Sequence, residues 1–236
     1  MESHVAKAEY KSNLQGVALL DVFNGKGTVY ASKNGHEASI TNKYNDLQII
    51  LTGDDLTDKG HRLTGGTVDE IVFAGPSDDL VKVSDKHMDA KDLGDALAHK
   101  GIEGMIRTIF AGDDKINGSN TEDTLFGWGA NDRINGRDGD DYLNGGSGQD
   151  VLTGGRGNDF FMFTKGYGND TITDFDRKND HDLIVVDEGD LKGMKIIQQG
   201  DDTVLEFKSG NTLTLLGVDA DDISRNFDFQ ESPDLF

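Results

Sequence analysis

Aspartates recur every nine residues in the middle of this 236-residue chain. They are Asp114, Asp123, Asp132, Asp141, Asp150 and Asp159, and two positions after each comes an apolar residue, at Ile116, Leu125, Ile134, Leu143, Leu152 and Phe161. A flexible linker has no reason to keep an aliphatic side chain at a fixed spacing. The pattern therefore indicates a folded repeat that presents a row of carboxylates, the ligands of a hard cation.

Glycines complete the pattern, which follows G-G-x-G-x-D-x-U-x between residues 118 and 162. At positions one, two and four they allow a tight turn, because glycine reaches positive φ at little cost. Positions seven to nine then form a short strand whose middle side chain points inward. Two repeats make one coil of 18 residues. Every second turn is therefore expected to stack, one strand spacing of about 4.8 Å apart.

Stacking brings the aspartates into pairs. The expected pairs are Asp114 over Asp132, Asp123 over Asp141, Asp132 over Asp150, and Asp141 over Asp159. Two carboxylates about 5 Å apart repel by about 3 kcal/mol at an effective dielectric constant near 20. A cation between them removes that repulsion. Carboxylates and turn carbonyls in a chain without cysteine suit several Ca²⁺ ions better than Zn²⁺ or octahedral Mg²⁺.

The turn residues around the aspartates complete the predicted metal sites. They are Gly112, Gly127, Gly129, Gly136, Asp138, Gly139, Gly145, Ser147, Gly148, Gly154, Arg156 and Gly157. The stretch from Gly136 to Asp159 is the most regular, since Thr121 and Ala130 replace the position-four glycine in earlier copies. A narrow apolar stripe alone does not offset the backbone entropy of ordering the repeats. Calcium binding is therefore expected to be coupled to their folding.

The nonapeptide pattern resembles that of the RTX calcium-binding family. The resemblance implies a right-handed parallel β-roll with calcium in its turns, and a protein secreted through a type I exporter that reads a C-terminal signal. The segment GYGNDTITDFDRKNDHDLIVV is similar to the one that closes such rolls in secreted metalloproteases and alginate epimerases. There Asp170, Asp174 and Asp176 either complete a terminal calcium site or are turn and strand-end residues. The tail NFDFQESPDLF is similar to export signals of this kind.

The acidic composition of the chain limits the kinds of molecule that it is expected to bind. The chain has 44 acidic and 23 basic residues and a net charge of −21, which argues against nucleic acid and anionic membranes. It has no cysteine, as expected of an exported chain that metal stabilises without disulfides. We find neither an N-terminal signal peptide nor a transmembrane run in the sequence. The predicted localisation is therefore extracellular or at the cell surface, reached by the type I route.

The flanking regions both predict β-structure. Residues 1–108 are expected to form a β-rich domain, with strands in VALLDVF, GTVYAS, LQIILT, GTVDEIVFA and LVKV. Its one predicted helix, DAKDLGDALAHK, places Ala90, Leu93, Ala96 and Leu97 on one face and ends at Gly101. Residues 109–165 form the roll. Residues 166–236 form a β-cap with two hairpins in MKIIQQ, TVLEFK and NTLTLLGV, and carry the export signal. The predicted fold class is mainly β.

Catalytic motifs are not recognisable. His36 and Glu37 lack the second histidine of a zinc-protease helix, because position 40 is isoleucine. Trp128 either stacks on a sugar ring or packs against the neighbouring turn. The predicted function is calcium binding without catalysis, as an adhesion, a biofilm matrix component or a carbohydrate-binding protein, with extracellular polysaccharide or a cell surface as partner. The alternative is a secreted enzyme whose active site lies in residues 1–108.

Overall fold

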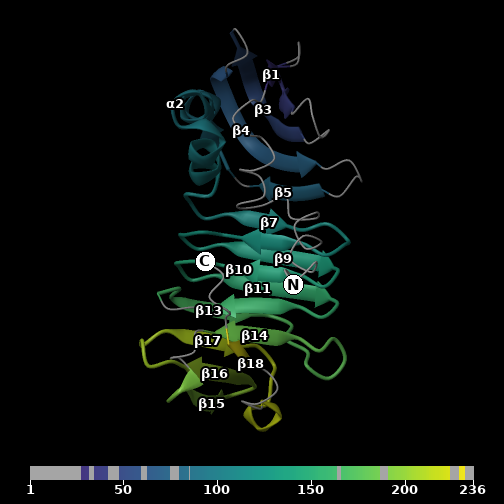
Figure 1. Cartoon of the computed structure of the whole chain (residues 1–236), viewed down its shortest axis with the longest axis vertical. Coiled ribbons are helices and arrows are strands. Elements are labelled where there is room, and N and C mark those ends of the chain that lie inside the picture. The colour runs from purple at the N-terminus through teal and green to yellow at the C-terminus, as the bar shows by residue number, and fades with distance from the viewer. Residues whose placement is uncertain are drawn as a thin grey trace, which may run out of the picture. The chain divides into compact units, whose positions relative to one another are not determined.

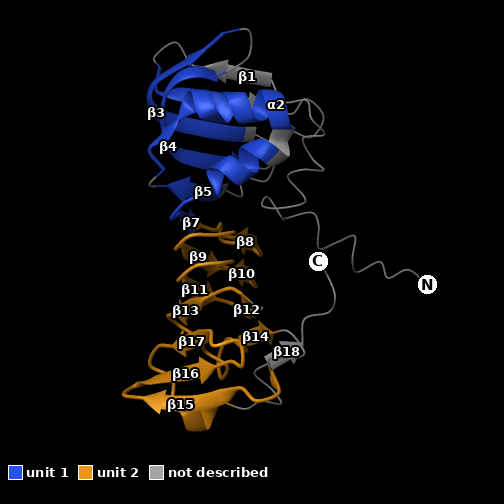
Figure 2. Ribbon diagram, turned by 90° about the vertical axis from the view of Figure 1, so that its left-hand side faces the viewer, with its two compact units in different colours: residues 1–116 blue, residues 117–236 orange. Residues whose placement is uncertain are grey.

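The computed structural model describes residues 28–31, 35–41, 48–59, 63–74, 80–84, 86–163, 166–186, 191–223 and 229–231. The chain divides into two compact units, residues 1–116 and 117–236 (Figure 2). Most described elements are strands, and in the second unit most of them pair in parallel, so the chain is a mainly β protein with a parallel β-roll (Figure 1). The predicted division at residues 108 and 165 stays a prediction.

The first unit contains an antiparallel sheet of consecutive strands. They are β1 (Thr28–Ala31), β2 (Glu37–Thr41), β3 (Gln48–Asp58), β4 (Leu63–Ala74) and β5 (Leu80–Ser84), and β6 (Met88–Asp89) pairs with β4. The predicted strand VALLDVF lies outside the described residues. Strands β2 and β6 were not predicted. The alternation in β2, with Ala38 and Ile40 between polar residues, was overlooked, and β6 is only two residues long.

Helix α2 (Ala90–Ile109) follows β6 and packs on β4. It begins where Asp89 caps it, accepting a hydrogen bond from the Lys91 N–H at 2.8 Å. The predicted end at Gly101 is wrong. The helix continues because its apolar face does: Met105 and Ile109 are as fully buried as Leu93. Tertiary burial of this second half outweighs the low helix propensity of Gly101 and Gly104.

The repeats form short strands that alternate between two parallel sheets. One sheet contains β8 (Thr124–Phe126), β10 (Tyr142–Asn144), β12 (Phe160–Phe163), β14 (Leu183–Val186) and β18 (Phe229–Glu231). The other contains β9 (Arg133–Asp138), β11 (Val151–Arg156) and β13 (Asn169–Ile172). The first repeat supplies strand β7 (Lys115–Asn117).

The register confirms the predicted coil. Leu125 pairs with Leu143 and Leu143 with Phe161 in one sheet, and Ile134 pairs with Leu152 in the other. Each of these position-eight side chains is at most 2 % exposed. Partners are 18 residues apart, and the hydrogen bonds from main-chain N–H groups to aspartate side chains of the next coil have the same spacing. The apolar stripe is therefore the core of the roll.

The last coils are longer than the repeat predicts. Leu152 pairs with Ile172 and Phe161 with Ile184, and the corresponding turns are 20 and 23 residues apart. The added residues lie in the turns, because both strands keep their inward apolar side chains. The parallel stacking therefore continues past the last nonapeptide.

The predicted hairpins of the β-cap are confirmed. Strand β17 (Thr212–Leu215) pairs in parallel with β13, and β16 (Asp202–Glu206) and β15 (Lys195–Gln199) continue the sheet antiparallel. A short 3-10 helix, η2 (Ala220–Asp222), follows. The rings of Phe163 and Phe207 stack with centroids 4.6 Å apart. This contact joins the core of the roll to that of the cap, which covers apolar surface at the end of the stack.

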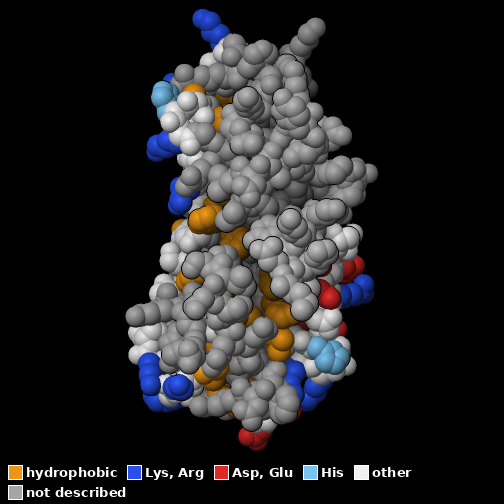
Figure 3. Space-filling view, in the orientation of Figure 1, with side chains coloured by type: hydrophobic (Ala, Val, Ile, Leu, Met, Phe, Trp, Pro, Cys, Tyr) orange, Lys and Arg blue, Asp and Glu red, His pale blue; other side chains and the backbone are white. Residues whose placement is uncertain are grey.

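On the face drawn in Figure 3, the Lys and Arg side chains of the described residues are scattered over both units and do not gather in one area. Among the described residues, no helix has the length and apolar character needed to cross a membrane.

Candidate calcium sites in the turns of the roll

A ladder of hydrogen bonds fixes the aspartates of the repeats. In three of them the Oδ1 atom accepts a hydrogen bond from the main-chain N–H of the aspartate one coil earlier: Asp141 from Asp123 at 2.8 Å, Asp150 from Asp132 at 2.7 Å, and Asp159 from Asp141 at 2.9 Å. All five residues are at most 2 % exposed. The predicted stacking of these aspartates is therefore confirmed, and their carboxylates are held inside the turns.

The second carboxylate oxygen, Oδ2, of two ladder aspartates lacks the hydrogen bond that Oδ1 accepts. Within the described residues, Oδ2 of Asp141 and Oδ2 of Asp159 are buried and have no hydrogen-bond partner. A Cβ added at Gly136 would lie 2.1 Å from Oδ2 of Asp141 and 2.6 Å from the carbonyl oxygen of Gly154. A carboxylate oxygen and a main-chain oxygen thus converge beside a residue without a side chain. Burying them without compensation is unfavourable, and a hard cation provides the compensation.

The pKa values show the cost of this arrangement in the absence of metal. Burial, together with the neighbouring carboxylates of Asp123 and Asp159, raises the pKa of Asp141 to about 8, against the lowering effect of the hydrogen bond from the Asp123 N–H. Burial likewise raises the pKa of Asp159 to about 7, helped by Asp182. The row of carboxylates is therefore unfavourable as anions unless a cation is present.

The ladder continues beyond the nonapeptides. Asp170 accepts a hydrogen bond from the Asp150 N–H at 3.0 Å, which continues the ladder, and its predicted place in a terminal calcium site stays a prediction. The other terminal position belongs to Asp182, whose Oδ1 accepts from the Asp159 N–H at 3.0 Å. Burial raises the pKa of Asp170 to about 7 and that of Asp182 to about 6. Sequence reasoning missed Asp182 because the longer turn breaks the nine-residue count, although Asp182-Leu183-Ile184 keeps the D-x-U spacing.

The other two acids of this segment make turn hydrogen bonds. Both oxygens of Asp174 accept from main-chain N–H groups, those of Gly154 and Gly155, at 2.9 Å each. Asp176 accepts from the N–H groups of Lys178 and Asn179, and hydrogen bonding from the Asn179 side chain lowers its pKa. These contacts favour the turn interpretation for both. A metal-binding role of Asp176 stays a prediction.

The glycines predicted at position one pack in the same way along the roll. A Cβ at Gly127 would lie 2.1 Å from Oδ2 of Asp132 and 2.5 Å from the carbonyl oxygen of Gly145. The same close approach to the aspartate of its own repeat recurs at Gly145 and Gly154. The repeated geometry means that any cation held at one turn has an equivalent place at the next.

Position-four glycines serve the stacking of the turns. Gly157 has φ +130°, and a Cβ there would lie 2.0 Å from the carbonyl oxygen of Gly139. Gly148 approaches the Ala130 carbonyl in the same way. At position three, Gly129 forms a bridge with Ser147. Gly112 differs, since an added Cβ would meet nothing within 4 Å. The first repeat is therefore looser at this position than the later ones.

Position-three side chains point away from the carboxylates. Asp138, Ser147 and Arg156 are exposed, and the Asp138 carboxylate lies 3.8 Å from the Arg156 guanidinium. No three His, Cys, Asp or Glu side chains converge to hold a metal within the described residues. A cation in these turns would therefore combine one or two carboxylates with main-chain carbonyl oxygens. That ligand set suits Ca²⁺ and is poor for transition metals.

Trp128 lies at position two of a turn with φ +76° and is 40 % exposed. Its carbonyl oxygen accepts a hydrogen bond from the Ser147 N–H at 3.1 Å, and its ring centroid lies 6.3 Å from that of Phe126. The indole is therefore partly packed on the roll and partly exposed. Ligand contact by Trp128 stays a prediction.

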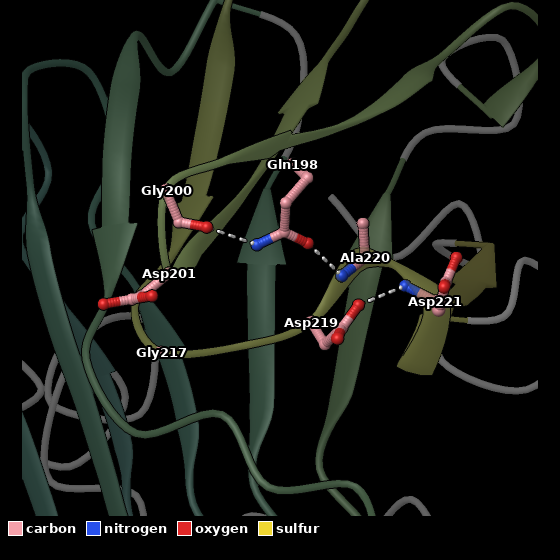
Figure 4. A pocket seen from close by; sticks show the side chains of 7 residues that line it. All are labelled: Gln198, Gly200, Asp201, Gly217, Asp219, Ala220 and Asp221. Carbon is pink, nitrogen blue, oxygen red and sulfur yellow. Dashed lines mark hydrogen bonds between the residues drawn. The ribbon is translucent and has the colours of Figure 1, made fainter.

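A second acidic group lies in the β-cap, around a pocket of about 580 Å³ (Figure 4). Gln198 spans it, donating to the Gly200 carbonyl at 3.0 Å and accepting from the Ala220 N–H at 2.7 Å. The Asp219 carboxylate accepts from the Asp221 N–H at 2.9 Å. These hydrogen bonds hold the turns around the pocket, so the positions of Gln198 and Asp219 are explained by the structure of the turns.

Comparison with known proteins agrees with this geometry. Residues 110–143 and 129–161 match the family described as RTX calcium-binding nonapeptide repeat (4 copies). This segment is an RTX calcium-binding repeat region. RTX repeats bind Ca²⁺, so calcium is the cation to which the carboxylate ladder is matched. The part of the chain outside residues 110–161 is not covered by the match.

Two solved structures are similar to parts of the chain. The solution structure of the AlgE6R3 subunit from the Azotobacter vinelandii mannuronan C5-epimerase has 27 % identity and a TM-score of 0.41, over 50 % of this chain and 77 % of that one. The extracellular lipase LipA from Serratia marcescens has 18 % identity and a TM-score of 0.31, over 85 % of this chain and 30 % of that one. Both TM-scores are low, and neither likeness by itself indicates a function. No curated protein matches the chain.

Proposed function

We propose that this RTX protein is secreted and that its roll folds on binding Ca²⁺ outside the cell. The observation that carries the proposal is the pair of buried Oδ2 atoms of Asp141 and Asp159, which have no hydrogen bond within the described residues and lie beside position-one glycines. Unpaired buried carboxylate oxygens oppose folding. A bound cation turns the same atoms into a stabilising contact.

The proposed ligands form two rows, one on each side of the roll. One row contains Asp123, Asp141, Asp159 and Asp182, and the other contains Asp132, Asp150 and Asp170. Main-chain carbonyl oxygens of the turns complete each site. When bound, calcium supplies positive charge between the turns. The aspartates themselves hold the turns in register through their Oδ1 hydrogen bonds.

Coupling to folding follows from the size of the repeating unit. Strands such as β8 and β10 are three residues long and each buries one apolar side chain, Leu125 or Leu143. So little apolar burial does not offset the entropy of ordering nine residues. The free energy of calcium binding is then part of the free energy of folding, as in other small metal-dependent domains.

A location outside the cell fits the chemistry of such sites. Weak calcium sites of extracellular modules have dissociation constants of about 0.1 to 1 mM. They fill in the external medium and stay empty in a cytosol kept low in calcium, so the chain crosses a type I exporter unfolded and folds afterwards. The net charge of −21 and the absence of cysteine support this route. We propose a binding role outside the cell, as an adhesion, a matrix component or a carbohydrate-binding protein.

Calorimetric calcium titration of the full chain, followed in parallel by circular dichroism, tests the metal part of the proposal. Asp141→Asn should weaken binding at least about tenfold, because it removes a charged ligand oxygen. Glu122→Gln is the matched control, because it removes one charge from an exposed position of the same region. Equal titration curves for the two variants would refute the assignment of the ladder.

Export is tested separately, by the amount of protein in medium and in cells. Deleting residues 187–236 should abolish secretion through a type I exporter, whereas deleting residues 1–100 should not. Secretion that survives the C-terminal deletion would overturn the route without affecting the calcium sites. A glycan array with and without calcium then distinguishes a carbohydrate-binding protein from a passive matrix component.

A further inference from the structure

The first aspartate of the series has a partner that differs from those of the later ones. The side chain of Lys86 reaches the buried Asp114 carboxylate, and its ammonium nitrogen contacts Oδ1. The Lys86 side chain is 4 % exposed and that of Asp114 is fully buried. A buried ammonium is tolerated only where oxygen atoms compensate its charge. The lysine is therefore held at a site that is made for a cation.

Main-chain and aromatic groups complete this site. The Lys86 ammonium donates to the carbonyl oxygen of Ile109, the last residue of α2. That carbonyl lies at the helix C-terminus, where the helix dipole favours positive charge. The Phe110 ring centroid lies 5.9 Å from the ammonium nitrogen, within the range of a cation–π contact. One carboxylate and one main-chain oxygen around a desolvated cation are the same kinds of ligand that the calcium turns offer.

The contact with a lysine distinguishes Asp114 from four of the later aspartates. Within the described residues, Asp141, Asp159, Asp170 and Asp182 form no ion pair with a basic side chain. Lys86 belongs to the first unit, where its N–H donates to the Asp69 carbonyl at 3.3 Å. Asp114 belongs to the same unit, so this unit contains its own cation for Asp114.

We propose that the Lys86 ammonium permanently takes the place at Asp114 that Ca²⁺ takes at the later aspartates. Asp114 is then not a calcium ligand, the turn that carries it is ordered without metal, and calcium binding begins with the following repeats. This inference rests on the proposed function, because it assumes that the later aspartates bind calcium. It also revises the sequence-based prediction that Asp114 is a metal ligand.

The number of calcium ions bound by the full chain tests the proposal by calorimetry. Asp114→Asn should leave that number unchanged, whereas Asp141→Asn should lower it. A loss of calcium with Asp114→Asn that equals the loss with Asp141→Asn would overturn the role of Lys86. No loss with either variant would instead refute the proposed function, so the two failures are distinguishable.

Removing the lysine should increase the number of calcium ions bound, whereas Asp114→Asn should leave that number unchanged. Lys86→Met keeps the aliphatic stem and leaves Asp114 as a buried lone carboxylate, so the protein should melt at a lower temperature in EDTA. Calcium should then raise the melting temperature more than in the wild type, and an additional ion should bind. The double variant Lys86→Met with Asp114→Asn should recover stability in EDTA and lose the additional ion. The same calcium-induced rise in melting temperature in Lys86→Met and in the wild type would contradict the proposal. If Lys86→Met fails to fold, the calcium titration of Asp114→Asn still tests the proposal.

Discussion

The carboxylate of Asp182 accepts a hydrogen bond from the main-chain N–H of Asp159 at 3.0 Å, although 23 residues separate them. In the repeats the same bond joins aspartates 18 residues apart. The ladder is thus a property of the stacked coils, and it outlasts the nonapeptide pattern. Asp182 takes its place in the ladder because Ile184 still pairs with Phe161 in the core.

Asp182→Asn should therefore weaken calcium binding at the last coil about as much as Asp159→Asn does. Asp176→Asn should have the smaller effect, since Asp176 already accepts three hydrogen bonds from Lys178 and Asn179. Calorimetric titration of the three variants measures the difference. If Asp176→Asn proved the most damaging, the terminal site would be built around the turn acid.

The sequence predicted the roll well because its pattern is both local and repeated. The spacing of Asp141 and Leu143 defines a turn, a strand and a stacking distance, and the registers agree. Asp170 was named as a candidate ligand only through the resemblance of its segment to the end of RTX rolls. The structure gives it a hydrogen bond from the Asp150 N–H, and its metal-binding role stays a prediction. Asp182 was missed because nothing in a nine-residue rule predicts how many residues an inserted turn contains.

Outside the repeats, tertiary contacts determine features of the structure that local sequence patterns did not predict. The end of α2 was misplaced at Gly101, where a local stop signal was outweighed by the burial of Met105 and Ile109. The pairing of Lys86 with Asp114 was also unpredictable, because 28 residues and a helix separate them. No periodicity in the sequence connects the two positions.

Without calcium, order in the roll should increase as the pH falls. Burial raises the pKa of Asp141 to about 8 from an ordinary value of 3.8, so the folded roll binds more protons than the unfolded chain between these limits. Stability then falls as the pH rises through this window. Circular dichroism in EDTA should show more ordered structure at about pH 5 than at about pH 9. Asp141→Asn should reduce this dependence, whereas Glu122→Gln should not, and order that rises with pH in EDTA would contradict the prediction.

Calcium and protons should compete for the same oxygens. In the calcium-bound roll the carboxylates must be ionised, so binding releases protons and weakens below about pH 7, where Asp159 and Asp170 take up protons. Calorimetry in buffers of different ionisation enthalpy measures the protons released. A calcium affinity that does not change between about pH 5 and about pH 8 would mean that the metal does not bind the ladder carboxylates.

The two units should respond differently to the removal of calcium by a chelator. In EDTA at neutral pH the roll should lose order while the α-helical signal of α2 persists, because the packing of Leu93, Met105 and Ile109 involves no metal. Adding about 1 to 10 mM Ca²⁺ should restore the roll. Far-ultraviolet circular dichroism and the fluorescence of Trp128, the only tryptophan in the chain, follow the two processes. Flat traces in both signals would refute coupled folding.

Filling the space beside a ladder carboxylate should remove calcium binding at that turn. Gly136→Ala places a methyl group 2.1 Å from Oδ2 of Asp141 and 2.6 Å from the Gly154 carbonyl, so neither oxygen can keep its position. Calcium affinity should fall at least about tenfold, as for the loss of a ligand or its support. The matched control is Gly112→Ala, since a Cβ there meets nothing within 4 Å. Equal calcium titrations for the two alanine variants would show that the cation lies elsewhere in the turn, because only Gly136 faces both oxygens.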